Sequence, residues 1–405
     1  MNSCKIENTG GFYMFTFFKQ LTREEKLMTI MIIALFLPMI PCALVWLILT
    51  LYLLKTGDIK SAYQHIKGSR FILFFTILQL LVSLFYQNWI GFGFTFLLVM
   101  FFTISLFFRE HLTPRFFETM TTLIIYLSAV VGIIGFIQYM YILHTFNIDH
   151  FEIIIFNTPP NRVHSVYFNS NYYAMMINFF VGITFYKILN KSYSIKRLVS
   201  YILITLLNLF ILYLTGCRTA WPALMAGLVI MLLYSHHKKL FASVASLSGV
   251  AVVFLATHPR YIPRMSNFKH YLGVRLNIWR VALLNIKTHP LFGEGPMTYW
   301  HIYKNYPNAH PTQHAHNVFI DPVLSFGIVG IATIAPYFVA STKRLHKLHK
   351  LGCNDNLVGL IVGFILMTLI HGCLDYTIFF VQTSVLFLII IGSFDAYKKE
   401  IDSAD

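Results

Sequence analysis

Apolar runs of roughly 15 to 25 residues recur along almost the whole chain, and each is long enough to cross a bilayer as a helix. Among the 405 residues, 57% are hydrophobic and only 12% are charged. Soluble globular domains carry about twice that share of charged residues. We therefore predict an all-α polytopic membrane protein that forms a single membrane domain over residues 1–405. The net charge of +15 then reflects loop topology and gives no reason to expect nucleic acid as a partner.

Eleven apolar runs define the predicted spans. They cover residues 27–54, 71–85, 89–108, 119–143, 170–186, 198–214, 219–234, 240–256, 317–341, 357–370 and 377–395. Short basic loops, such as Lys187–Arg197 and Lys343–Lys350, recur along the chain, and each is separated from the next by two spans. All of them therefore fall on one side of the membrane, which the positive-inside rule identifies as the cytoplasm. Four segments are then predicted to lie on the outer side: Thr145–Asn169, the turn Gly216–Arg218, the interval 258–316 and the turn His371–Asp375.

The first run is longer than one span requires, and Pro38 and Pro41 interrupt it. Its N-terminal flank carries Lys19, Arg23 and Lys26, which also favour the cytoplasmic side. We predict a short hairpin that turns near the two prolines and crosses twice. This gives about twelve spans with both termini in the cytoplasm. A single tilted span with an external N-terminus is the alternative.

A polar, cationic interval at residues 258–316 is predicted to form a large extracytoplasmic loop. The interval contains seven arginines and lysines, only one carboxylate, Glu294, and seven histidines. The cations are Arg260, Arg264, Lys269, Arg275, Arg280, Lys287 and Lys304, and the histidines are His258, His270, His289, His301, His310, His314 and His316. Such a loop could bind an anionic, lipid-linked substrate.

An amphipathic helix is predicted inside this loop. Leu276, Trp279, Leu283 and Ile286 recur at helical spacing, and Pro290 ends the pattern. The helix would lie on the outer membrane surface and hold Arg275 and Arg280 near the lipid headgroups. Arginines that only contact anionic lipid are the alternative.

Arg218 stands in the turn between two predicted spans, on the side of the large loop. A guanidinium there offers a planar fork of donors to phosphate oxygens. An arginine that merely reaches towards lipid headgroups is the alternative.

His310, His314 and His316 lie where the loop re-enters the membrane. A histidine at this rim could take a proton from a hydroxyl near neutral pH. Asn317 could then orient a sugar hydroxyl, and Asp321 could orient the imidazole. A solvated loop histidine or a zinc site are the alternatives, but few carboxylates and no cysteine accompany these histidines. No D-x-D motif occurs, so we predict no metal and no other cofactor.

Four sequence segments resemble the bacterial O-antigen ligase and polysaccharide polymerase family. They are Thr215–Trp221, Arg275–Trp279 followed by Pro290–Gly295, His316–Asn317 followed by Ser325–Gly330, and Arg162–Ala174, in which Ser170 stands where the family usually has proline. The family-like core spans residues 160–340. The resemblance implies a GT-C-like helical bundle with a large external loop. It also implies transfer of a glycan from a polyprenyl-diphosphate carrier outside the cytoplasmic membrane.

The resemblance also implies roles for particular side chains. Arg218, Arg275 and His316 correspond to the family's catalytic residues. Arg280, His314 and Asn317 are weaker correspondences, and they join Arg264 and Arg162 as predicted substrate-binding residues.

The predicted reaction is a metal-independent, inverting glycosyl transfer in surface polysaccharide assembly, by a polymerase or a ligase. Its partners would be a lipid-linked glycan donor, a glycan or lipid-anchored acceptor and other polysaccharide-assembly proteins. The predicted location is the bacterial inner membrane, with the active site on the extracytoplasmic face. A transporter of an anionic lipid or polysaccharide is the alternative, although we see no internal repeat of the kind that transporters usually have.

Overall fold

The computed structural model describes residues 20–190, 193–259, 262 and 264–403, and every regular element within these ranges is helical, as predicted. Arg260 and Lys19 lie outside the described residues. The longer helices are α2 (Arg23–Ala34), α3 (Met39–Thr56), α4 (Asp58–His65), α5 (Arg70–Phe85), α6 (Trp89–His111), α7 (Pro114–Thr145), α8 (Ser170–Asn190), α9 (Ile195–Leu214), α10 (Ala220–Tyr234), α11 (Lys238–Thr257), α12 (Phe268–Thr288), α14 (Ile320–Leu351), α15 (Asp355–Gly372) and α16 (Val381–Ile391). Shorter helices are α13 (Thr298–Ile302) and α17 (Lys398–Asp402).

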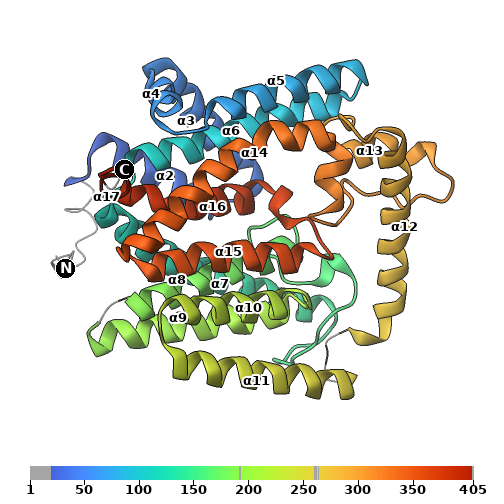
Figure 1. Ribbon diagram of the computed structural model, residues 1–405. Coiled ribbons are helices and arrows are strands. Elements are labelled where there is room, and N and C mark those ends of the chain that lie inside the picture. The colour runs from blue at the N-terminus through green and yellow to red at the C-terminus, as the bar shows by residue number, and fades with distance from the viewer. Residues whose placement is uncertain (1–19, 191–192, 260–261, 263, 404–405) are drawn as a thin grey trace.

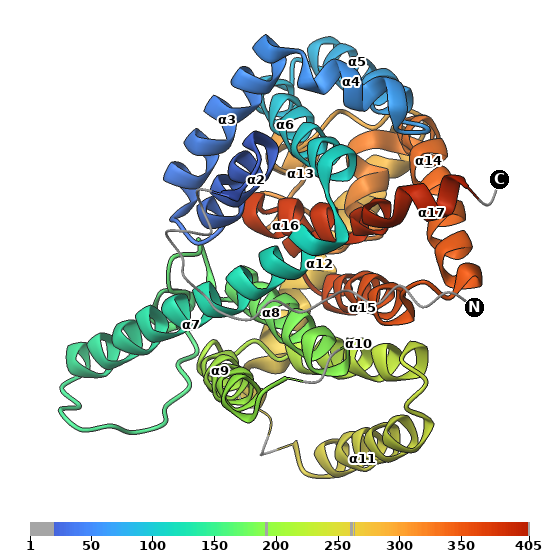
Figure 2. The same cartoon turned by 90° about the vertical axis from the view of Figure 1, so that its left-hand side faces the viewer.

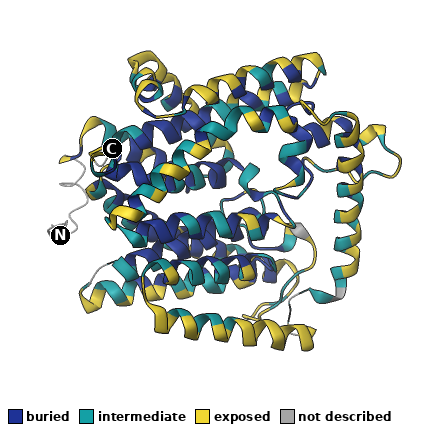
Figure 3. Ribbon diagram, viewed as in Figure 1, coloured by how far each residue is buried: buried dark blue, intermediate teal, exposed yellow. Residues whose placement is uncertain are grey.

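Most of these helices run side by side in one bundle, and α12 stands across one end of it (Figure 1). Helix α8 is buried along most of its length and packs against α7, α9, α10 and α15. At the other extreme, α11 has no buried residue (Figure 3). It lies at the edge of the bundle beside α10 (Figure 2). An apolar helix with this exposure is stable in lipid, which is the environment that the composition predicts.

Nine helices among the described residues are long and apolar enough to cross a membrane. They include α3, α6, α7, α8, α9, α11, α14, α15 and the segment Val381–Asp402. The other three predicted spans correspond to shorter helices: α2 has 12 residues, α10 has 15 and α5 has 16. Helix α5 also forms a bent pair with α4, at an angle of 111°. The chain is therefore an integral membrane protein, and the count of twelve spans stays a prediction.

The first apolar run folds as a helical hairpin, and its turn lies near Pro38, as predicted. Helix α2 ends at Ala34 and α3 begins at Met39, just after Pro38. Nη2 of Arg23, at the start of α2, lies 2.8 Å from Oδ2 of Asp58, which follows α3. Both flanks of the run therefore lie at the same end of the bundle, which one straight span would not allow.

Basic loops gather at this end of the bundle, where α17 also lies (Figure 1). Buried or half-buried ion pairs join three of them to neighbouring helices. Nε of Arg109 lies 2.7 Å from Asp395, Nε of Arg344 lies 3.0 Å from the same carboxylate, and Nζ of Lys187 lies 2.6 Å from Glu118. Their shared location agrees with the predicted placement of these loops on one side.

The four segments that were predicted to share the other side meet at the opposite end. Arg264 donates to the carbonyl oxygens of Gly216 and Asn157. The thiol of Cys217 lies 3.4 Å from Nε2 of His371. These contacts join residues 146–169, the turn after α9, the long polar interval and the turn after α15.

The predicted amphipathic helix is present as α12, and it ends at Thr288, two residues before Pro290. Its buried face overlaps the predicted stripe only in part, since Trp279 and Ile286 pack against the buried cluster around Ile278. Leu276 and Leu283 are about half exposed, and the helix instead buries Ile278, Val281, Ala282 and Asn285. The helix packs on α14 rather than lying free on a lipid surface, so tertiary contacts select its buried face.

Two of the glycine-containing segments pack directly against each other. The backbone N–H groups of Ile328 and Val329 donate to the carbonyls of Pro290 and Leu291, at 3.0 and 2.8 Å. Gly327 has φ +61° and ψ 179° and kinks α14 at this contact. A Cβ on Gly327 would lie 2.3 Å from the Leu291 carbonyl oxygen. These glycines therefore serve close backbone packing that positions the loop beside α14.

Candidate active site

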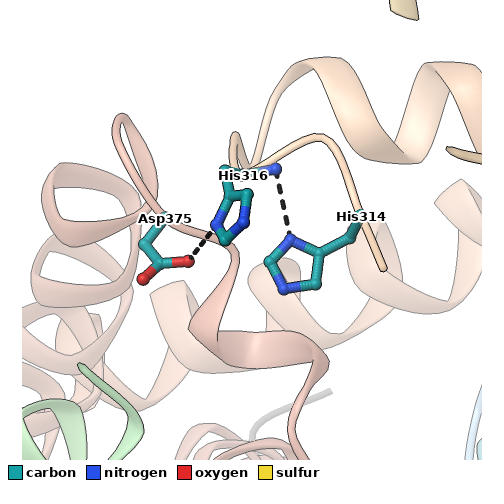
Figure 4. Close-up of side chains that lie close together, drawn as sticks. All are labelled: His314, His316 and Asp375. Atoms are coloured by element: carbon teal, nitrogen blue, oxygen red, sulfur yellow. Dashed lines mark hydrogen bonds and ion pairs between the residues drawn. The ribbon is translucent and has the colours of Figure 1, made fainter. Parts of the chain in front are cut away.

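His316 and Asp375 form the centre of a polar cluster at the end of the bundle that carries α12. Nδ1 of His316 lies 2.7 Å from Oδ1 of Asp375, as Figure 4 shows. A carboxylate only accepts hydrogen bonds, so Nδ1 carries the proton and Nε2 is left with a lone pair. The backbone of His316 is held at φ +50°, a conformation that residues other than glycine rarely adopt and that often marks functional sites.

His314 supports His316 from the side opposite to Asp375 (Figure 4). Nδ1 of His314 accepts the backbone N–H of His316 at 3.2 Å. The other ring nitrogen therefore carries the proton and faces the hydroxyl of Tyr172 at 3.2 Å. His314 is 2% exposed, so it positions His316 rather than meeting a solvent-borne substrate.

Asp375 is itself held by residues that are far away in the chain. Asn171 donates to its Oδ2 at 2.5 Å, and the backbone N–H of Tyr376 donates to its Oδ1 at 2.9 Å. Arg162 donates to Oδ1 of Asn171 at 2.8 Å and to the carbonyl oxygen of Thr215 at 2.6 Å. Arg162 therefore links the Asp375 carboxylate to the turn that carries Arg218.

The predicted orienting role of Asp321 was wrong. Asp321 does not reach His316; its carboxylate accepts the N–H of Ala315 at 3.3 Å and the hydroxyl of Ser325 at 3.1 Å. The reason is that His316 lies before α14 and its ring turns towards the end of α15, away from the first turn of α14.

The side chain of Asn317 is occupied by the backbone. Its Oδ1 accepts the N–H groups of Phe319 and Ile320, and its Nδ2 donates to the carbonyl of Cys373 at 3.0 Å. It caps the start of α14 and ties that start to the turn after α15. These hydrogen bonds give the Asn317 amide a structural role, and its contact with a sugar hydroxyl stays a prediction.

The turn Gly216–Arg218 holds a cluster of guanidinium groups. Nη1 of Arg218 donates to the carbonyl oxygen of Arg264 at 3.0 Å, and the Arg218 guanidinium lies 5.4 Å from the ring centre of Phe268. Nε of Arg264 is buried without a partner among the described residues. An unpaired buried donor on Arg264, next to the guanidinium of Arg218, favours an anion as its missing partner.

The pKa values of Arg162 and Arg218 are lowered by burial and by a neighbouring positive charge. Burial lowers the pKa of Arg162 to about 10, and the charge of Arg264 acts in the same direction. Burial and then Arg264 also lower the pKa of Arg218. Three positive charges in a partly desolvated space would be relieved by a bound diphosphate.

Arg275 belongs to the His316 cluster, but Arg280 does not. The guanidinium of Arg275 lies close enough to His316, His314 and Asp375 to shift their pKa values. Arg280 is exposed and donates to the carbonyl oxygen of Pro307 at 3.3 Å. Arg275 therefore remains a candidate ligand for a phosphate, whereas Arg280 fixes a loop.

The protonation states of His316 and Asp375 suit His316 for the role of a general base. Burial lowers the pKa of His316, against the opposing effect of Asp375. Burial would raise the pKa of Asp375, but the nearby His316 outweighs it and holds that pKa well below the usual range. At neutral pH the pair is therefore a neutral imidazole beside a carboxylate, with Nε2 able to accept a proton.

His314, His316 and Asp375 also form the one group among the described residues that could hold a metal, with ligand atoms within 4.8 Å of one another. The same atoms already bind each other: Nδ1 of His316 faces Asp375, and Nδ1 of His314 accepts a backbone N–H. The charge of Arg275 also opposes a cation there. These residues fit a hydrogen-bonded base better than a metal site.

Cys217 and Cys373 do not meet in a disulfide; both thiols are free. Cys217 is buried against His371, and the thiol of Cys373 donates to the carbonyl of Leu369. Burial would raise the pKa of Cys217, but His371 and Arg162 lower it to about 7. This contact adds a second link between the Arg218 turn and the turn that holds Asp375.

The sequence patterns did not single out Asp375, Asn171 or Tyr172 as site residues. Asn171 and Tyr172 lie inside the family-like segment Arg162–Ala174, so the sequence did indicate that their region belongs to the family-like core. Asp375 lies in a short turn that was expected at the same end of the bundle. Its pairing with His316 depends on how α14 and α15 pack.

A comparison with known protein families matches part of the chain. Residues 203–335 match the family model Wzy_C, described as O-antigen ligase. The match contains Arg218, Arg275 and His316, and it confirms the predicted resemblance over that region. Segment Arg162–Ala174 and Asp375 lie outside it. No curated protein matches the chain.

Proposed function

Given this O-antigen ligase region and the cluster around His316, we propose that the chain is a membrane glycosyltransferase of surface polysaccharide assembly. It transfers a glycan from a polyprenyl-diphosphate carrier to an acceptor hydroxyl at the extracytoplasmic face of the inner membrane. The observation that carries the proposal is a neutral, carboxylate-oriented imidazole beside a set of arginines.

The arginines would bind the donor's diphosphate. Arg218 and Arg264 adjoin each other at the turn after α9, and Arg275 approaches from α12 on the His316 side. As the bond between the anomeric carbon and the diphosphate oxygen breaks, the electron pair leaves on that oxygen. Fixed guanidinium groups stabilise this developing charge and supply what a metal ion would otherwise provide.

His316 would act as the general base. Its Nε2 accepts the proton of the acceptor hydroxyl while the acceptor oxygen forms its bond to the anomeric carbon. Asp375 stabilises the imidazolium that results and keeps the ring in the productive tautomer. Attack opposite to the leaving diphosphate inverts the anomeric configuration.

The experiment compares cells that lack this protein with cells that carry the wild type or His316→Ala. Mass spectrometry of lipid-linked intermediates and surface polysaccharide follows the product, and immunoblotting of membranes controls for insertion. We expect loss of product with His316→Ala despite normal insertion. Normal product from the inserted variant would refute the proposed base.

The same cells separate the two acceptor classes. Single-repeat carriers accumulate if the protein is a polymerase, whereas full-length unattached polymer accumulates if it is a ligase. Purified protein in detergent separates both from a transporter, because turnover of lipid-linked donor without a membrane gradient excludes pure transport.

A further inference from the structure

A shallow pocket of about 600 Å³, wide open to the outside, lies between α12 and the loop that follows α13. Its lining residues are Lys269, His270, Gly273, Val274, Asn277, Asn308, Ala309, His310 and Pro311. The volume falls within the range of small-ligand sites. None of the residues assigned above to diphosphate binding or to the base lines it.

The lining chemistry suits an acidic saccharide. Asn277, Asn308 and His310 offer amide and imidazole groups for sugar hydroxyls, and Lys269 offers a positive charge. No carboxylate is among the described residues that line the pocket. An uncompensated ammonium among neutral hydrogen-bonding groups selects a ligand that carries a negative group, such as a carboxylate or a phosphate.

The pocket lies on the face of α12 that points away from Arg275. Gly273 and Asn277 stand two residues before and after Arg275, which in an α-helix puts them on the opposite side. On the Arg275 side, Nε1 of Trp279 donates to the carbonyl oxygen of Ala315 at 3.1 Å. On the pocket side, the backbone N–H of His310 donates to Oδ1 of Asn277 at 3.1 Å. The segment from His310 to Ala315 therefore passes from the pocket to the base.

This segment brings the pocket next to the free nitrogen of the base. Pro311 lines the pocket, and the hydroxyl of the next residue, Thr312, lies 2.9 Å from Nε2 of His316. A glycan that fills the pocket and continues over Pro311 would bring a hydroxyl to the position that the Thr312 hydroxyl now holds.

We propose that this pocket is the acceptor subsite and that the acceptor is an acidic glycan. The inference rests on the proposed function, because an inverting transfer needs the acceptor and the leaving diphosphate on opposite sides of the anomeric carbon. Arg275 and the pocket lie on different sides of α12, and the segment from His310 to Ala315 runs from the pocket to His316. An acceptor can therefore approach the base from the pocket while the diphosphate lies with the arginines.

Direct binding to the purified full-length protein in detergent tests the proposal. The probes are tetragalacturonate, which is acidic, and maltotetraose, which is neutral, with affinity measured by calorimetry. We expect tetragalacturonate to bind more tightly, and Lys269→Ala to weaken it by about tenfold, the usual effect of losing one charge-assisted hydrogen bond. Lys269→Arg should restore most of the affinity.

Matched variants separate the pocket from general electrostatics. Lys304→Ala removes a cation that lies in the same loop region but outside the pocket, stacked on Tyr303, and should leave tetragalacturonate binding unchanged. His310→Ala should weaken tetragalacturonate binding, because it removes an imidazole that lines the pocket. The loop itself should keep its conformation, since its contacts at this residue are made by the backbone. Equal losses with Lys269→Ala and Lys304→Ala, equal affinity for both probes, or no binding of tetragalacturonate by the wild type would overturn the inference.

The binding assay needs no turnover, so the two proposals fail separately. Wild-type affinity in the pocket variants refutes the acceptor subsite and leaves the transfer reaction standing. Normal product from inserted His316→Ala refutes the base, while Lys269-dependent binding would still mark the pocket as a carbohydrate site.

Discussion

The hydroxyl of Thr312 lies 2.9 Å from Nε2 of His316, on the side of the ring that faces away from Asp375. Because Nδ1 already carries the proton, this hydroxyl donates to the lone pair that a base would use. Thr312 thus holds the place that an acceptor hydroxyl would take in the reaction.

His316→Gln should abolish most transfer, because the amide cannot take up the acceptor's proton. A general base typically contributes two to four decades in rate, so a loss of about that size is expected in turnover by purified protein. Thr312→Val removes the competing hydroxyl and keeps the side-chain shape, and its loss should be far smaller. Comparable losses in both variants would instead point to a proton relay through Thr312.

Asp375→Asn should lower turnover and also change its pH dependence. Burial puts the pKa of His316 below its usual value, so the wild-type base is neutral at pH 7, and activity falls only as the pH drops through that lowered pKa. The charge of Asp375 raises this pKa, so its removal should move the acid limb of the kcat/KM profile to still lower pH. A limb that stays in place or moves upward would argue against the pairing.

Arg218→Ala and Arg275→Ala should each cost about two to three decades in kcat, the usual effect of removing one group that stabilises a developing anion. Arg280→Ala should cost much less, since this guanidinium is exposed and binds a loop carbonyl. Steady-state kinetics with a lipid-linked donor measures all three. A loss with Arg280→Ala as large as the other two would place the diphosphate elsewhere on α12.

Chelation should leave turnover unchanged if the arginines provide the charge stabilisation. The measurement is activity of the purified protein after dialysis against EDTA, with and without added Zn²⁺ or Mg²⁺. Added Zn²⁺ should inhibit, because a metal held by His314, His316 and Asp375 would occupy the base. Loss of activity on chelation that is reversed by metal would establish a metal-dependent reaction.

Gly327→Ala should destabilise the protein. The new Cβ would lie 2.3 Å from the carbonyl oxygen of Leu291, and the residue has φ +61°. Backbone strain of this kind costs about 1–3 kcal/mol, and the clash adds to it. Gly249→Ala is the matched control, because it lies on exposed α11 with open space around it. Thermal unfolding in detergent should show a lower Tm for Gly327→Ala alone.

The apolar runs were sufficient to predict an all-helical membrane protein, because backbone groups in lipid must be satisfied within each helix. Loop charges were sufficient to predict which segments share an end of the bundle. The family-like motifs singled out Arg218, Arg275 and His316 as candidates, because guanidinium and imidazole groups can be recognised from the sequence alone.

Only the tertiary structure decided which carboxylate orients His316. Asp321 is near in sequence, but helix geometry turns its carboxylate towards Ser325, whereas Asp375 reaches the imidazole through the packing of α14 and α15. The buried face of α12 was decided in the same way, since its sequence offers two apolar stripes and only contact with α14 selects one. Periodicity along the chain fixes which elements form, but contacts between residues distant in sequence determine which side chains meet.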